Sequence, residues 1–158
     1  MAIDLFGDHF VDGREYAKKI VSKAISLPFY KIKKHPDYNI EYFHGDEKVH
    51  LNEPGLYAIY RKVDGKMEAL YNGISAQPVN QRVYRFIKEL DGRSRKDETH
   101  PGAKKARLHG IKSSDDLYVK VLYYKDFPIV QNAIFPLVAL DEYIAPILGS
   151  KFNKKVKR

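Results

Sequence analysis

The chain has 158 residues, no cysteine and a formal net charge of +8. The lack of cysteine excludes disulfides, thiol catalysis and zinc sites made of thiolates. Apolar and charged fractions of 44% and 30% are typical of a globular protein, and the length fits one domain. No apolar run is long enough to span a membrane and no signal pattern opens the chain, so we expect a cytoplasmic protein. A pI of about 9.4 favours a polyanionic partner, most often nucleic acid. A basic protein without such a partner is the alternative.

The first third of the chain predicts one helix followed by an irregular segment. Apolar residues recur at helical spacing up to Pro28, and Asp12 with Glu15 fits a capping box at the start of this helix. Residues 29–51 contain Pro36 and Gly45, and we interpret them as irregular. The basic residues of this region form either a solvated surface or a surface that contacts phosphates; they include Lys18, Lys19, Lys23, Lys33 and Lys34.

From Pro54 onward the pattern predicts strands and then a helix. Residues 55–60 and 67–72 are expected to form two antiparallel strands joined by a turn at Asp64-Gly65. Pro78 suits the first turn of the following helix, which should end at Asp91-Gly92. Its expected buried residues are Val79, Val83, Ile87 and Leu90.

The last part of the chain predicts a short helix, a third strand and a final helix. Residues 92–102 lack an apolar face and are expected to form a loop, and residues 101–110 contain a short basic helix. Residues 117–124 are β-branched and aromatic, which is typical of a strand. The final helix should run from near Pro136 to about Leu148, before a basic tail at 151–158.

These elements predict an α+β fold with a small antiparallel three-stranded sheet flanked by helices. Residues 1–53 are expected to form a helical N-terminal elaboration that packs on a core of residues 54–158, because they are too few to bury a core alone.

Five elements in a fixed order resemble the GIY-YIG nuclease family. Residues 55–57 (GLY) precede residues 71–73 (YNG), Arg82 follows on the next helix, and Glu142 and Asn153 lie late in the chain. The resemblance implies an α/β sandwich in which Tyr57 and Tyr71 position or activate the attacking water. It also implies that Arg82 braces the phosphate, that Glu142 binds Mg²⁺, with Mn²⁺ as a substitute, and that Asn153 supports the site.

The residue types suit this chemistry, and each also has a simpler interpretation. An arginine is a permanently charged donor for phosphate oxygens, but Arg82 could equally be a surface residue. Glu142 lies in an apolar segment, where a carboxylate needs a cation, a partner or solvent. One carboxylate plus waters and substrate is a usual way to hold Mg²⁺. Tyr57 and Tyr71 could instead be half-buried strand aromatics.

One position departs from the family pattern. Many members carry His or Tyr one turn after the helical arginine, and here that residue is Phe86, which cannot take a proton. Tyr57 then becomes the candidate general base, with Tyr84, His100 or His109 as substitutes.

The resemblance implies a metal-dependent endonuclease that cuts double-stranded DNA, close to the free-standing restriction or phage branch and related to homing enzymes. Such enzymes act in the cytoplasm of a bacterium or phage-infected host, often as homodimers or higher oligomers. The alternative is a non-catalytic DNA-binding protein that retains the fold, which Phe86 favours. The expected DNA contacts are Lys18, Lys19, Lys23, Lys33, Lys34, Arg85, Lys104, Lys105 and Arg107.

Overall fold

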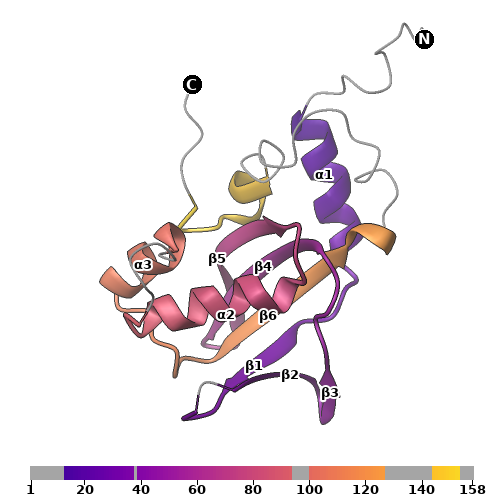
Figure 1. The fold of residues 1–158 in the computed structure, drawn as a ribbon. Helices are drawn as coiled ribbons and strands as arrows, with labels where there is room; N and C mark the ends of the chain where they lie inside the picture. The colour runs from indigo at the N-terminus through magenta and orange to yellow at the C-terminus, as the bar shows by residue number, and fades with distance from the viewer. Residues whose placement is uncertain (1–12, 38, 94–99, 127–143, 154–158) are drawn as a thin grey trace, which may run out of the picture.

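The fold is α+β and is organised around one six-stranded sheet (Figure 1). The computed structural model describes residues 13–37, 39–93, 100–126 and 144–153. Every strand pair is antiparallel, in the order β3-β2-β1-β6-β4-β5. The strands are β1 (Tyr30–Lys34), β2 (Ile40–His44), β3 (Glu47–Val49), β4 (Gly55–Val63), β5 (Lys66–Ser75) and β6 (Leu117–Tyr123). The helices are α1 (Gly13–Ala24), α2 (Val79–Leu90), α3 (Pro101–Leu108) and the short 3₁₀ helix η2 (Tyr124–Asp126), and residues 144–148 are also helical.

Helices cover both faces of this sheet. Successive side chains of a strand point to opposite faces, so neighbouring residues of one strand contact different helices. On β4, Leu56 packs with Ile20 of α1 and with Ile144, whereas Tyr57 packs with Val83 of α2. Helix α3 adds its buried alanines to the α2 side. The molecule therefore has three layers, with α2 and α3 on one face of the sheet and α1 on the other.

The predicted three-stranded sheet is wrong, because residues 30–49 contribute three further strands. Only the central residue of β1, Ile32, is buried, so this strand lacks the apolar alternation that identifies strands in a sequence. Pro36 and Gly45 lie in the connections between the new strands, and Gly45 has a φ of +60°. The N-terminal elaboration is therefore part helix and part sheet. Its boundary with the core at residue 54 and the sandwich of the GIY-YIG type stay predictions.

The later elements match the sequence analysis. The β4–β5 turn has positive φ at Asp64 and Gly65, and Pro78 directly precedes α2. The short basic helix and the third predicted strand are α3 and β6. Asp12 and most of the predicted final helix lie outside the described residues. Within the described ranges, no helix has the length and apolarity needed to cross a membrane.

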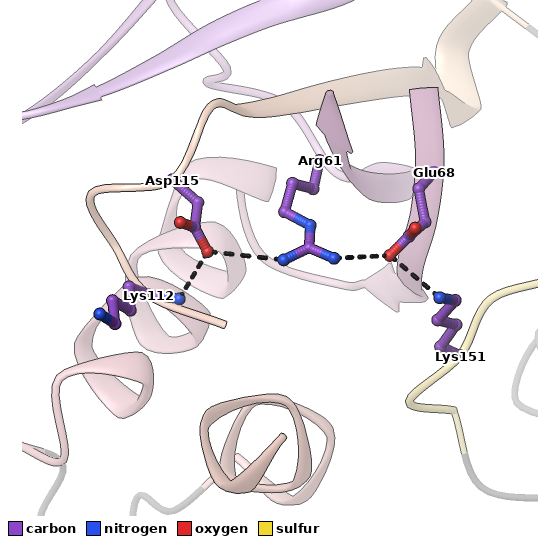
Figure 2. Close-up of polar contacts among 5 residues, drawn as sticks. All are labelled: Arg61, Glu68, Lys112, Asp115 and Lys151. Carbon is purple, nitrogen blue, oxygen red and sulfur yellow. Dashed lines mark hydrogen bonds and ion pairs between the residues drawn. The ribbon is translucent and has the colours of Figure 1, made fainter. Parts of the chain in front are cut away.

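A network of charged side chains ties the β4–β5 hairpin to two later segments (Figure 2). The Arg61 guanidinium lies 3.2 Å from the Glu68 carboxylate and 3.9 Å from Asp115, whose carboxylate accepts the Lys112 backbone N–H at 2.8 Å. Glu68 also pairs with Lys151 at 3.2 Å. The loop before β6 and the segment 150–153 are thereby held against the hairpin.

Candidate active site

Tyr57 and Tyr71 lie on the sheet face that α2 covers. Tyr57 is paired with Gly73 and Tyr71 with Ile59, so the two tyrosines occupy alternate positions of neighbouring strands and share one face. Their ring centroids are 6.2 Å apart. Tyr57 is 4% exposed, whereas Tyr71 is half-buried. The two motif tyrosines thus meet, and Tyr71 is the one that solvent reaches more easily.

Two glycines make room for these rings. A Cβ atom at Gly73 would lie 2.6 Å from the Tyr57 hydroxyl oxygen. A Cβ atom at Gly102, in the first turn of α3, would lie 2.6 Å from the Tyr71 ring. The glycine of the YNG motif is therefore required by contact with the other motif tyrosine. The need for glycine at position 102 was not visible in the sequence.

A third element adds His100 to the rings of Tyr57, Tyr71 and Phe86, and these four residues form the tyrosine cluster. Its ring lies 4.7 Å from that of Tyr71 and 5.3 Å from that of Phe86, between centroids, and Tyr71 and Phe86 are 5.8 Å apart. His100 is also the N-cap of α3, because its Nδ1 accepts the Ala103 N–H at 3.1 Å. Phe86 is fully buried, and an imidazole is present beside it although none is on α2.

The environment of His100 keeps its ring neutral. Burial lowers the pKa of His100 to about 4, and the positive charges of Arg82 and then Arg85 add to this effect. Since Nδ1 already accepts a hydrogen bond, the single proton of the neutral ring lies on Nε2. His100 can therefore donate a hydrogen bond at neutral pH, but it has no unused lone pair with which to act as a general base.

The other two proposed substitutes for a base, His109 and Tyr84, have different surroundings. His109 is exposed at the opposite end of α3, where its Nδ1 lies 2.8 Å from the Lys105 carbonyl oxygen and its ring lies 5.4 Å from Phe152. Tyr84 is half-buried on α2 and lines a groove between α2 and the strands β2 and β3, which does not include Tyr57 or Tyr71.

Asn153 is joined to the centre of the YNG motif. Its Oδ1 accepts the Asn72 N–H at 2.8 Å, and its Nδ2 donates to the Asn72 carbonyl at 2.7 Å. The Ser150 hydroxyl donates to Asn72 Oδ1 at 2.7 Å, and Phe152 N–H donates to the Leu70 carbonyl at 2.8 Å. These bonds attach the segment 150–153 to the edge of β5. Asn153 supports the backbone on either side of Asn72, directly after Tyr71.

The expected metal ligand, Glu142, lies outside the described residues. Within the described ranges, no group of three His, Asp or Glu side chains is arranged to hold a metal ion. The one buried glutamate of α2, Glu89, pairs with Arg107 of α3 at 3.6 Å. The described residues thus supply no ligand set for Mg²⁺, and its assignment rests on Glu142 and the family resemblance alone.

The expected DNA contacts do not form a single surface. Lys18, Lys19 and Lys23 are exposed on α1, on the sheet face opposite the tyrosines. Among the others, Lys33 is exposed on β1, Lys34 pairs with Asp91 at 3.2 Å, and Arg107 pairs with Glu89. Arg85, Lys104 and Lys105 are exposed on the two helices that cover the tyrosines.

The structure also contains a groove that the sequence analysis missed. It has a volume of about 620 Å³ and lies between α2 and the strands β2 and β3. Because residues 40–49 were interpreted as irregular, no surface was expected beside this helix.

Comparison of the chain with protein-family models, with curated proteins and with solved structures finds no match.

Proposed function

We propose that the protein is a divalent-metal-dependent endonuclease that hydrolyses phosphodiester bonds in double-stranded DNA, with an active site of the GIY-YIG type. The observation that supports this most is the meeting of Tyr57 and Tyr71 at 6.2 Å on the face covered by α2. Arg82 is half-buried on α2, and its positive charge, after burial, helps to lower the pKa of His100 in the same cluster. Asn153 holds the strand that carries Tyr71. Residues separated by almost a hundred positions therefore gather at one place.

In the proposed reaction, Arg82 binds the scissile phosphate and offsets the negative charge that develops on it. Tyr71 contacts the attacking water, because it is the more exposed of the two tyrosines. Tyr57, buried against Gly73, fixes the position of the Tyr71 ring and remains the second candidate for proton transfer. Because the His100 ring stays neutral, it adds no third positive charge beside Arg82 and Arg85.

Mg²⁺, or Mn²⁺ in its place, would supply further charge neutralisation at the phosphate when bound. Glu142 is assigned as its ligand from the family resemblance. The restriction or phage role, cytoplasmic action and assembly as a homodimer or higher oligomer belong to the same proposal. A pair of active sites would account for cutting both strands.

Incubation of purified protein with supercoiled plasmid tests this function. We expect nicked or linear plasmid with Mg²⁺ or Mn²⁺ and intact plasmid with EDTA. Glu142→Gln should abolish cleavage while leaving the DNA dissociation constant in EDTA within about threefold of the parent, since one charge contributes modestly to overall binding. Cleavage by Glu142→Gln at the parent rate would reject the assigned ligand.

The rival function is DNA binding without catalysis. It is favoured by the burial of Phe86 where a proton acceptor was expected, and by the occupied lone pair of His100. Retained binding with no cleavage across Mg²⁺, Mn²⁺, Co²⁺ and Ca²⁺ would select this rival. Sequencing the ends of any products on mixed-sequence DNA would report specificity and strand offset at the same time.

A further inference from the structure

The groove between α2 and the strands β2 and β3 is separate from the tyrosine cluster. Its α2 wall consists of the side chains that follow one another along one side of the helix, Gln81, Tyr84, Arg85 and Lys88, with Asn80 at its start. The opposite wall includes Lys48 of β3. A volume of about 620 Å³ is in the usual range for a pocket that holds a small molecule or a single nucleotide, and it is too small for a length of duplex.

The charges of the groove favour an anion. It is lined by three cationic side chains, Lys48, Arg85 and Lys88, and by a single carboxylate, that of Glu41. Lys48 pairs with Glu41 at 2.8 Å, and hydrogen bonds from Lys48 and then His35 lower the pKa of Glu41. The negative charge of Glu41 is thus already neutralised by Lys48, so Arg85 and Lys88 leave the groove with a net positive charge.

The uncharged side chains of the α2 wall are of the types that contact nucleobases. Asn80 and Gln81 carry amides, which pair with the edges of bases. Tyr84 is half-buried, and the Lys88 ammonium lies 5.8 Å from its ring centroid. An aromatic ring beside a cation is the combination with which proteins bind unpaired strands, the ring stacking on a base and the cation contacting a phosphate.

Arg85 connects the groove to Arg82. It lines the groove and follows Arg82 by three residues on α2, so the two arginines are neighbours on the helix surface. A strand whose phosphate lies on Arg82 would therefore reach the groove within a short distance along α2. We propose that this groove binds an unpaired segment of a DNA strand, with phosphates on Arg85 and Lys88 and a base against Tyr84, Asn80 and Gln81. The proposal deepens the proposed nuclease function, since the segment would flank the phosphate that is cut.

The test measures binding in EDTA, so that it does not depend on cleavage. Fluorescence anisotropy would compare three labelled probes of equal length: single-stranded dT12, an abasic strand of twelve deoxyribose phosphates, and a twelve-base-pair duplex. We expect dT12 to bind about tenfold more tightly than the abasic strand, because the bases add stacking and amide contacts. Tyr84→Ala and Gln81→Ala should each weaken dT12 binding about five- to tenfold and leave the abasic strand unchanged.

Lys66→Ala is the matched control, because Lys66 is an exposed cation at the start of β5 that does not line the groove. It should change dT12 binding by less than about twofold, as expected for one distant surface charge. Thermal melting of each variant would verify that it folds, and Tyr84→Phe, which keeps the ring, should bind dT12 as the parent does.

Equal binding of dT12 and the abasic strand, or equal weakening of all three probes by Tyr84→Ala, would overturn the proposal. The plasmid assay separates this outcome from the fate of the nuclease proposal. A protein that cleaves DNA but shows no base-dependent binding in the groove retains its function and loses this site. One that binds dT12 through Tyr84 but cleaves nothing keeps the site and loses the function.

Discussion

The two sides of helix α2 have opposite characters. One side carries Val83, Phe86 and Ile87, which are fully buried against the sheet and the tyrosine cluster. The other carries Gln81, Tyr84 and Lys88, which border an open polar groove. A buried, closely packed side fixes side-chain positions, as a reaction requires, whereas an open side with cations and amides can bind a strand. One helix could therefore separate the chemical step from strand binding. Substitutions on its buried side should change the cleavage rate, and substitutions on its groove side should change the affinity for DNA.

The largest effect is expected for Arg82→Ala. Removal of a donor that stabilises the developing phosphate charge should lower the single-turnover cleavage rate by roughly two to three orders of magnitude. The dissociation constant for DNA should change by less than about threefold, because many other phosphate contacts remain. Quenched-flow cleavage and anisotropy on the same DNA give the two quantities, with Lys66→Ala as control. A loss of binding equal to the loss of rate would remove the contrast between the two sides.

The second effect concerns the pH dependence of stability on the buried side. The pKa of His100 is lowered to about 4 by burial and by Arg82 and Arg85. Its neutral form is therefore favoured in the folded protein, and the unfolded chain takes up a proton first as the pH falls below about 6.5. The contribution of the neutral His100 ring to the free energy of unfolding is fully present above about pH 6.5. It falls by up to about 3 kcal/mol between about pH 6.5 and 4.

Urea unfolding at a series of pH values measures this slope. His100→Asn is the informative variant, because asparagine also accepts the hydrogen bond of an N-cap but does not titrate. Its slope should be flatter than that of the parent over this window. An unchanged slope in His100→Asn would show that the folded protein does not hold this ring neutral.

A smaller loss of stability is expected for Gly102→Ala. The added Cβ would lie 2.6 Å from the Tyr71 ring, and such overpacking costs about 1–3 kcal/mol. In a Tyr71→Leu background the ring is absent, so Gly102→Ala should then cost less than about 1 kcal/mol. A double-mutant cycle measured by urea unfolding tests the contact. Equal costs in both backgrounds would mean that Tyr71 does not limit the space at position 102.

The smallest effect is expected at the edge of β5. Asn153→Ala removes both hydrogen bonds to the Asn72 backbone and should cost about 1–2 kcal/mol. Lys151→Ala, which removes an exposed ion pair to Glu68, should cost less than about 1 kcal/mol. Chemical unfolding of both variants gives the comparison. If the two substitutions lower the free energy of unfolding by the same amount, the amide of Asn153 does not hold strand β5.

The sequence indicated the elements with strong local signals. The Asp64-Gly65 turn, Pro78 before α2 and the β-branched run of β6 each follow from local backbone chemistry, and each is present. Strands β1 to β3 were missed because Ile32 is the one buried residue of β1 and lysines surround it. That strand depends on pairing with β2 and β6, which no local pattern records.

Local sequence patterns also explain which residues of the candidate site could be predicted. The two tyrosines were predictable because register places alternate residues of paired strands on one face. The packing of His100 on Tyr71, and the space left by Gly102, depend on how α3 packs against the sheet. The groove depends on strands that were not predicted, so Tyr84 and Gln81 could not be singled out from the sequence.

The most direct test of this division compares Tyr71→Phe with Tyr84→Ala on one DNA duplex that carries an unpaired segment beside the cleaved phosphate. Each variant is measured for its single-turnover cleavage rate at saturating protein and for its dissociation constant in EDTA. We expect Tyr71→Phe to lower the cleavage rate by roughly two orders of magnitude at unchanged affinity. We expect Tyr84→Ala to weaken affinity about five- to tenfold at an unchanged saturated rate. A Tyr71→Phe protein that cleaves at the parent rate, or a Tyr84→Ala protein whose saturated rate falls as far, would contradict this division.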